Sequence, residues 1–230
     1  MNHSANDPNS WNQLFNIGGY AAIAVVCIIP IQILIFSVFP PPSNVVGFFE
    51  LFNQNWFLGL LSLDLLYLVN NAIIIILYLA LFAALRKTHF AYMLIAITVG
   101  LVGITTYYAS AVAFEMMSLS NQYFTTEDIA IKQQMLAAGQ SMLVTYKGTA
   151  FDVYYILNAV TLLLISRVML MDKTFSRSTA IWGLVSGVLM LIPSTAGTLG
   201  LIFSLLSLIP WIVFSILIAI RLFKLAKAER

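Results

Sequence analysis

Residues 178–220 read STAIWGLVSGVLMLIPSTAGTLGLIFSLLSLIPWIVFSILIAI, and no side chain in this stretch is charged. A helix needs roughly 20 apolar residues to cross the hydrocarbon core of a bilayer. The stretch is long enough for two such helices, which we expect at 180–194 and 201–222, joined around Ala196-Gly197-Thr198-Leu199-Gly200. Strands of a membrane barrel are shorter and alternate in polarity, so this continuous pattern predicts helices.

Four more apolar runs precede this stretch, at 18–39, 57–85, 90–116 and 149–171. The whole chain is 61% hydrophobic and 9% charged, whereas soluble domains carry about 25% charged residues. A water-soluble fold of this size could not keep so much apolar surface away from solvent. The sequence therefore predicts an all-α, polytopic membrane protein whose core is a bundle of six transmembrane helices.

The basic residues predict how this bundle is oriented. With six spans, nine of the eleven Lys and Arg residues fall on the same side as both termini: Arg86, Lys87, Arg167, Lys173, Arg177, Arg221, Lys224, Lys227 and Arg230. Basic residues are enriched on the cytoplasmic side of membrane proteins. We therefore expect a multi-pass protein of the cell membrane with a cytoplasmic N-terminal segment at 1–17, a transmembrane domain at 18–223 and a basic cytoplasmic tail at 224–230.

Two connecting segments on the opposite, outer side are predicted to contain short interfacial helices. Residues 44–57 mix large apolar side chains with Glu50 and Asn53, a composition typical of a helix at a membrane surface. The second segment follows Thr126-Glu127-Asp128, whose acids suit a helix N-terminus. There we expect an amphipathic helix of one or two turns.

Three carboxylates lie in the predicted spans or at their outer ends. Ionisable groups in a span are costly and are candidates for function by default. Each has tyrosine or amide side chains at helical spacing on the same face. The candidate binding set is Asp64 with Tyr67 and Asn71, Glu115 with Tyr108, and Asp152 with Tyr155. Gathered together, these groups would bind a small cation, an amine or a proton.

Structural interpretations remain open for the same residues. Glu115 and Asp152 also suit hydrated positions at a membrane interface, and Asp64 suits a hydrogen-bonded position in the core. Tyrosines are common in interface belts. Gly183 and Gly187 form a Gly-x-x-x-Gly pattern, which is typical of close helix packing.

The sequence contains no motif for a catalytic or metal site. His3 and His89 are the only histidines and Cys27 is the only cysteine, so zinc-type spacing is missing. There is no Gly-x-Ser-x-Gly elbow and no phosphate-binding glycine loop. We expect no cofactor, and an enzymatic activity has no support. A basic tract for nucleic acid is also missing, which leaves the lipid bilayer and other membrane subunits as expected partners.

Four short motifs spread over the chain carry a family resemblance: Ile17-Gly18-Gly19-Tyr20, Leu77-Tyr78-Leu79-Ala80-Leu81, Trp182-Gly183-Leu184, and Pro210-Trp211 with Arg221-Leu222. With them the chain resembles a family of bacterial six-helix integral membrane proteins catalogued only as a domain of unknown function (number forty-three eighty-six). The resemblance implies a six-helix bundle in the bacterial inner membrane. It implies no activity, cofactor or catalytic residue.

Three functional hypotheses follow from these observations. The first is a structural or accessory subunit of a larger membrane complex, as the small size and the sparse chemistry indicate. The alternative is a binder or transporter of a small cation, an amine or a proton-coupled solute, which the carboxylates favour. An intramembrane lipid-modifying enzyme is the last hypothesis, because the sequence offers no nucleophile–base set.

Overall fold

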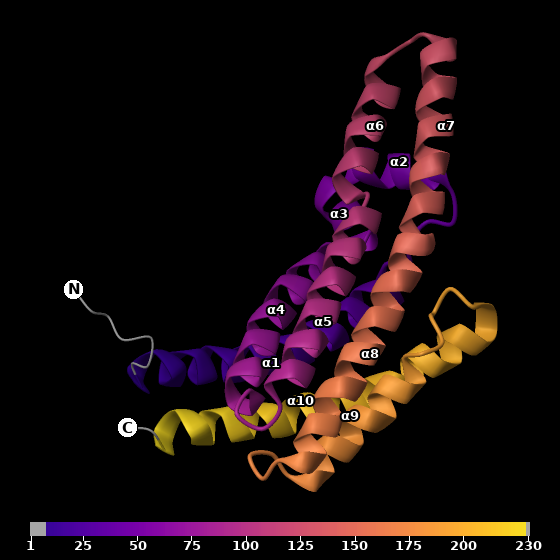
Figure 1. The fold of residues 1–230 in the computed structure, drawn as a ribbon. Helices are drawn as coiled ribbons and strands as arrows, with labels where there is room; N and C mark the ends of the chain where they lie inside the picture. The colour runs from indigo at the N-terminus through magenta and orange to yellow at the C-terminus, as the bar shows by residue number, and fades with distance from the viewer. Residues whose placement is uncertain (1–7, 229–230) are drawn as a thin grey trace. The chain divides into compact units, whose positions relative to one another are not determined.

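The computed structural model describes residues 8–228, which form helices and no strands. The helices are α1 (Pro8–Val38), α2 (Val45–Gln54), α3 (Trp56–Ser62), α4 (Leu65–Leu85), α5 (Phe90–Ser110), α6 (Ala113–Thr125), α7 (Ile129–Tyr146), α8 (Thr149–Met171), α9 (Arg177–Leu189) and α10 (Gly197–Ala228). Figure 1 shows their order along the chain. The all-α prediction is confirmed for this part of the chain.

Five helical segments among the described residues are long and apolar enough to cross a membrane: Trp11–Val38, Leu65–Leu85, Phe90–Thr125, Ile129–Met171 and Gly197–Ala228. The protein is therefore a multi-pass membrane protein. The remaining predicted span, 180–194, corresponds to α9, which has only 13 residues and is shorter than the roughly 20 needed for a crossing. Pro193 follows soon after α9, and a proline disfavours helix at the residue before it. The count of six is not confirmed.

Two predicted spans are interrupted. The run at 57–85 contains α3 and α4, separated at Leu63 and Asp64, so the expectation of one continuous helix there is wrong. The run at 90–116 contains the whole of α5 and the start of α6, separated at Ala111 and Val112. A continuous apolar run indicates that a segment prefers lipid to water. It does not prevent a local turn where other parts of the protein form hydrogen bonds with the backbone groups that the turn frees.

The two connecting segments that are predicted to lie on the outer side are helical. Asn44 caps α2 by accepting a hydrogen bond from the Gly47 amide at 2.9 Å, and the predicted helix at 44–57 is present as α2 and the start of α3. Asp128 caps α7, accepting from the Ala130 amide at 2.8 Å. At 18 residues α7 is much longer than the predicted one or two turns. The position of these helices at a membrane surface stays a prediction.

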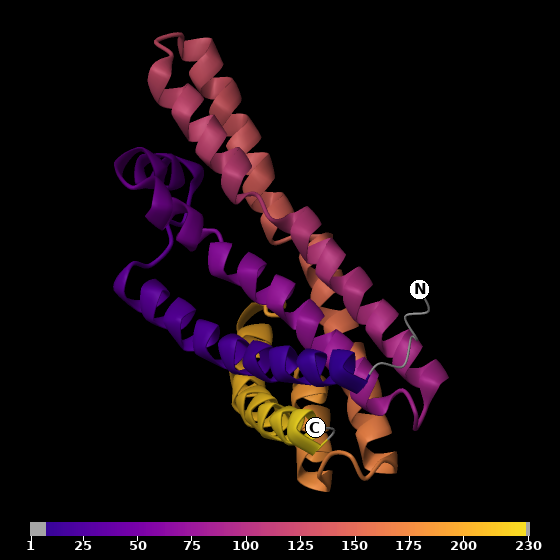
Figure 2. The same cartoon turned by 90° about the vertical axis from the view of Figure 1, so that its left-hand side faces the viewer.

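The chain divides into two compact units, and the division falls inside α1, α4, α5 and α8. Among the described residues, unit 1 contains 8–27, 70–105 and 154–228, and unit 2 contains 28–69 and 106–153. Each unit has its own hydrophobic core. In unit 2, α6 and α7 lie side by side as a hairpin in both views (Figure 1, Figure 2), and α2 packs against both of them.

In unit 1, glycines let α9 approach its neighbours closely. A Cβ added at Gly183 would overlap the Ser166 hydroxyl of α8 and lie 2.7 Å from Phe214 Cε2 of α10. At Gly187 an added Cβ would lie 2.9 Å from Leu163 Cδ2 of α8. The structure thus places both glycines of the Gly-x-x-x-Gly pattern on packed surfaces, where only a hydrogen fits.

A buried polar network connects α4, α5 and α8 of unit 1. The Tyr78 hydroxyl donates to Asn158 Oδ1 at 2.6 Å, and Asn158 Nδ2 donates to the Tyr154 carbonyl at 3.0 Å. The Thr161 hydroxyl donates to the Ala96 carbonyl of α5 at 3.1 Å. Such bonds between membrane helices contribute about 0.6–2 kcal/mol each.

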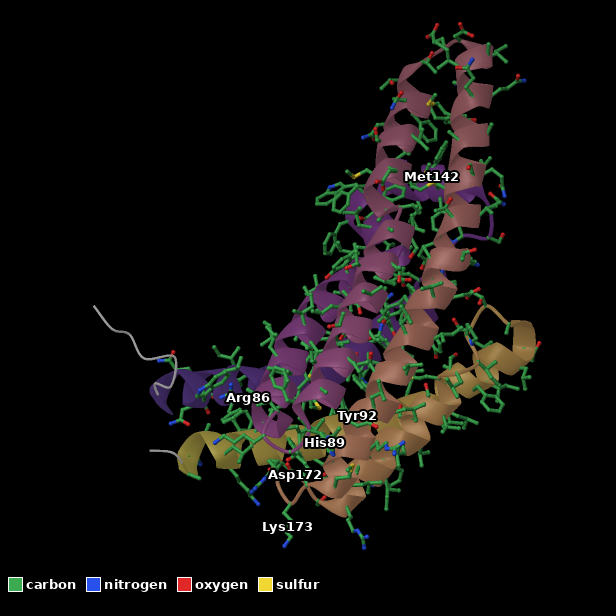
Figure 3. The ribbon with its side chains drawn as sticks, in the orientation of Figure 1. Arg86, His89, Tyr92, Met142, Asp172 and Lys173 are labelled. Carbon is green, nitrogen blue, oxygen red and sulfur yellow. The ribbon has the colours of Figure 1, made fainter. Side chains whose placement is uncertain are left out.

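The basic residues of unit 1 gather around loops that contact one another. Thr88, in the α4–α5 turn, donates to the Asp172 carboxylate in the α8–α9 loop. Arg221 of α10 donates to the Thr174 carbonyl of that loop, and Arg86 lies 3.9 Å from the ring centroid of Trp11. Figure 3 shows Arg86, Asp172 and Lys173 at this same end of the unit. The start of α1 and the end of α10 therefore share one end of unit 1 with both loops.

Asp172 holds two of these loop segments in place. Its partial burial acts to raise the pKa of its carboxyl, but hydrogen bonds from Thr88 and Thr174 outweigh this and hold the pKa below its ordinary value. Hydrogen bonds favour the charged form of the acceptor that receives them. Asp172 is thus an anion at neutral pH, surrounded by the basic loops.

Candidate functional site at a break between two helices

The break between α3 and α4 places Asp64 in an unusual backbone conformation. α3 ends with hydrogen bonds from the amides of Leu63 and Asp64 to carbonyls three residues earlier, and α4 begins at Leu65. Asp64 has φ 63°, the only positive φ of a non-glycine residue in the part of the chain described. Aspartate tolerates the left-handed region better than most residues, and such positions cluster at functional sites.

The Asp64 side chain is partly buried and accepts a hydrogen bond from the Tyr146 hydroxyl at the end of α7. Asp64 stands just before the Leu65–Leu85 span. Burial raises the pKa of its carboxyl to about 6, while the hydrogen bond from Tyr146 and the positive charge of Lys147 limit the rise. The carboxyl can therefore gain or lose a proton close to physiological pH.

Tyrosines surround this break. The Tyr67 ring lies 6.2 Å from the ring of Tyr107, measured between centroids. The Tyr108 hydroxyl donates to the Leu68 carbonyl at 3.3 Å. α4 and α5 thus meet through aromatic and hydrogen-bond contacts within unit 2, on the first turn after Asp64.

Two further polar side chains are buried beside the break. Gln32 of α1 donates through Nε2 to the Leu61 carbonyl at 3.4 Å. Its Oε1 atom and the hydroxyl of Ser62, a residue that is 3% exposed, have no hydrogen-bond partner among the described residues. Buried polar atoms nearly always have a hydrogen-bond partner. These two unpartnered oxygen atoms therefore mark a place where a ligand or water would gain hydrogen bonds.

A cleft of about 690 Å³ opens within unit 2 next to these groups. Its apolar lining includes Phe36, Pro41, Pro42, Phe48, Leu143 and Val144. Its polar lining consists of Ser43, Asn44, Ser62, Gln140, Tyr146 and Lys147. Tyr146 therefore touches both the cleft and Asp64. The volume lies in the range of small-molecule sites.

The other two acids of the predicted set, Glu115 and Asp152, each lie in the first turn of a helix. Glu115 is exposed in the first turn of α6, and Asp152 is partly buried in the first turn of α8. Across residues 8–228 no three His, Cys, Asp or Glu side chains are grouped to hold a metal ion. The convergence of the three acids in one pocket stays a prediction.

Two members of the predicted set belong to unit 1. Asn71 is fully buried in α4. Tyr155 is partly buried in α8 and bonds to Ser204 and Ser207 of α10. Both side chains contribute to the polar interior of that unit.

Sequence reasoning missed Tyr146, Lys147, Ser62 and Gln32. Lys147 is one of the two basic residues that the predicted topology places on the outer side, but nothing in the sequence pairs it with Asp64. The hydrogen bond from Tyr146 joins residues 82 positions apart. Helical periodicity relates only residues within a few turns, so it carries no signal for this pair.

Comparison with protein-family models, with curated proteins and with solved structures finds no match to the chain. The family resemblance noted in the sequence therefore stays a prediction.

Proposed function

We propose that the protein is a solute-binding protein of the bacterial inner membrane and that Asp64 is the proton-bearing group of its site. The observation that supports this most directly is the Asp64 carboxyl itself, held at positive φ in a helix break and hydrogen-bonded by Tyr146. Interrupted helices in membrane transporters form binding sites where irregular backbone faces a cavity. Here a cleft lies directly beside the break.

The other two hypotheses have less support. Exposed apolar side chains occur along α1, α5 and α10, for example Leu34, Ile95 and Leu205, and contact with lipid accounts for them without a partner subunit. No particular surface of the described residues therefore supports a role as an accessory subunit. A lipid-modifying enzyme still lacks a nucleophile–base set.

The proposed topology has six passes and cytoplasmic termini. α9 and α10 form a hairpin, and the Arg221 contact with Thr174 shows that α10 returns to the end where α9 begins. The basic residues in the last turns of α10 then lie on the same side as Lys173 whether α9 crosses completely or only in part. By the positive-inside rule this side is the cytoplasm.

Cysteine labelling checks this topology. Cys27 is first replaced by serine, and single cysteines are introduced by Gln134→Cys in α7 and Lys173→Cys in the α8–α9 loop, both exposed positions. An impermeant thiol reagent applied to intact cells should modify position 134 and leave position 173 unmodified until the membrane is opened. The reverse pattern would contradict the orientation.

Native mass spectrometry tests the binding function. We expect protein purified from membranes in mild detergent to retain a non-covalent small molecule. Asp64→Asn removes the charge and the titrating proton but keeps an oxygen that accepts from Tyr146, so the fold should persist. The occupancy of the wild-type protein should change between pH 5 and pH 7.5, because the pKa of the Asp64 carboxyl lies at about 6. The occupancy of Asp64→Asn should be the same at both pH values, because the amide does not titrate.

The matched control is Glu50→Gln, which removes an exposed acid from α2 of the same unit. It should retain the same bound mass as the wild-type protein. The same pH dependence of occupancy in the wild-type protein and both variants, or no bound molecule in any of them, would contradict the proposed function.

A further inference from the structure

The unit 2 cleft combines an apolar wall with one cation. Phe36, Phe48 and Leu143 contribute to the apolar side, which suits a hydrocarbon chain. Lys147 is the only charged residue among the described residues that line the cleft, and it is exposed. A lysine at the rim of an apolar cleft can extend its ammonium group toward the headgroup of a bound molecule.

Buried hydrogen-bonding groups stand beside this cation. Ser62 lines the cleft, and its side chain is only 3% exposed to solvent. Its hydroxyl has no hydrogen-bond partner in the described part of the chain. The Tyr146 hydroxyl is already bonded to Asp64. An acceptor-rich headgroup would receive hydrogen bonds from Ser62 and a charge-assisted contact from Lys147.

We propose that the cleft binds a single-chain amphiphile with an acidic headgroup. Lys147 binds the headgroup, and the apolar wall covers the chain. This inference rests on the proposed function, because it names the class of solute that the site beside Asp64 takes. An amphiphile with a cationic headgroup would place like charges together at Lys147 and is disfavoured.

Asp64 couples this binding to protons. The charged or titratable groups that act on it or on its partner Tyr146 are Lys147 and Tyr67. When Asp64 is ionised it attracts Lys147 and repels an acidic headgroup; when it is protonated it does neither. Since its pKa lies at about 6, acidic amphiphiles should bind more tightly at pH 5 than at pH 7.5. By linkage, their binding should also favour proton uptake by Asp64.

Two permanently charged probes with the same chain test the inference: octanesulfonate and octyltrimethylammonium. Neither probe titrates, so any effect of pH belongs to the protein. A ligand that binds the native state raises its melting temperature in proportion to binding. Melting curves of the full-length protein in uncharged detergent should therefore rise with octanesulfonate and not with octyltrimethylammonium. The apparent affinity for octanesulfonate should fall by roughly fivefold or more from pH 5 to pH 7.5.

Lys147→Gln should weaken octanesulfonate binding by roughly tenfold. It should fold normally because the side chain is exposed. Lys132→Gln is the matched control, since it removes another cation of unit 2, which lies 5.3 Å from the Tyr123 ring centroid and does not line the cleft. This control should bind as the wild-type protein does.

Two results would overturn the inference: equal or tighter binding of octyltrimethylammonium, or unchanged octanesulfonate binding in Lys147→Gln. In either case a bound mass that depends on Asp64 in native mass spectrometry would still support the proposed function. If the bound mass also did not depend on Asp64, both the proposed function and the proposed ligand class would be contradicted.

Discussion

Gly183→Leu should lower the melting temperature of the purified protein by roughly 6–12 °C. A Cβ at this position would overlap the Ser166 hydroxyl and approach Phe214 to 2.7 Å, so α9 would have to move away from α8 and α10. Overpacking of a tight core costs about 3 kcal/mol, and each kcal/mol shifts the melting temperature by roughly 2–4 °C in a chain of this size. Thermal unfolding in detergent, followed by intrinsic fluorescence, measures the change.

Val188→Leu is the control for this substitution. Val188 lies on the same helix and is 55% exposed, so a longer side chain there meets no packed neighbour. Its melting temperature should stay within a degree or so of the wild type, since exposed substitutions are usually near neutral. A similar melting temperature in both variants would show that the Gly183 face is not a packed interface.

Asn158→Leu should destabilise unit 1 by roughly 2–4 kcal/mol. The substitution removes the acceptor of the Tyr78 hydroxyl and leaves that donor buried, which costs about 1–3 kcal/mol. It also enlarges a contact that is already tight, because a Cβ added at Gly103 would lie 2.7 Å from Asn158 Nδ2. Strain from the larger apolar side chain adds to the cost. Thermal or chemical unfolding in detergent gives the total.

A double-mutant cycle separates the hydrogen bond from the change in volume. Tyr78→Phe removes the donor with little change of shape, so the combined Tyr78→Phe, Asn158→Leu variant should lose less than the sum of the two single variants. The coupling should be about 1 kcal/mol. Strict additivity would mean that the bond contributes nothing. Ile156→Leu, on the exposed side of α8, controls for substitution in this helix.

The contacts at Gly183 and at Asn158 show which close helix contacts the glycine pattern in the sequence predicts and which it does not. The spacing of Gly183 and Gly187 indicates a close contact on one face of α9, and the structure adds which residues lie opposite. Gly100 and Gly103 have no such spacing, yet α5 approaches Tyr78 and Asn158 through them. The network that these glycines make room for joins residues 80 positions apart.

Apolar length and composition determined that this protein crosses a membrane as helices, because a bilayer leaves backbone polar groups no other partner than the helix itself. The run at 149–171 predicted α8 to the residue. The distribution of Lys and Arg along the chain likewise predicted that the basic loops share one side. The contacts of Thr88 with Asp172 and of Arg221 with Thr174 place these loops at one end of unit 1.

Tertiary structure alone decided where the apolar runs break and which polar groups meet at the break. Residues 60–68 are leucines apart from Ser62, Asp64 and Tyr67, and they contain no Gly or Pro, so a continuous helix is the local expectation. The turn at Leu63 and Asp64 exists together with the hydrogen bond from Tyr146 on α7. That contact depends on the packing of α2, α6 and α7 into a second core, and packing over such chain distances is not encoded in the periodicity of any one segment.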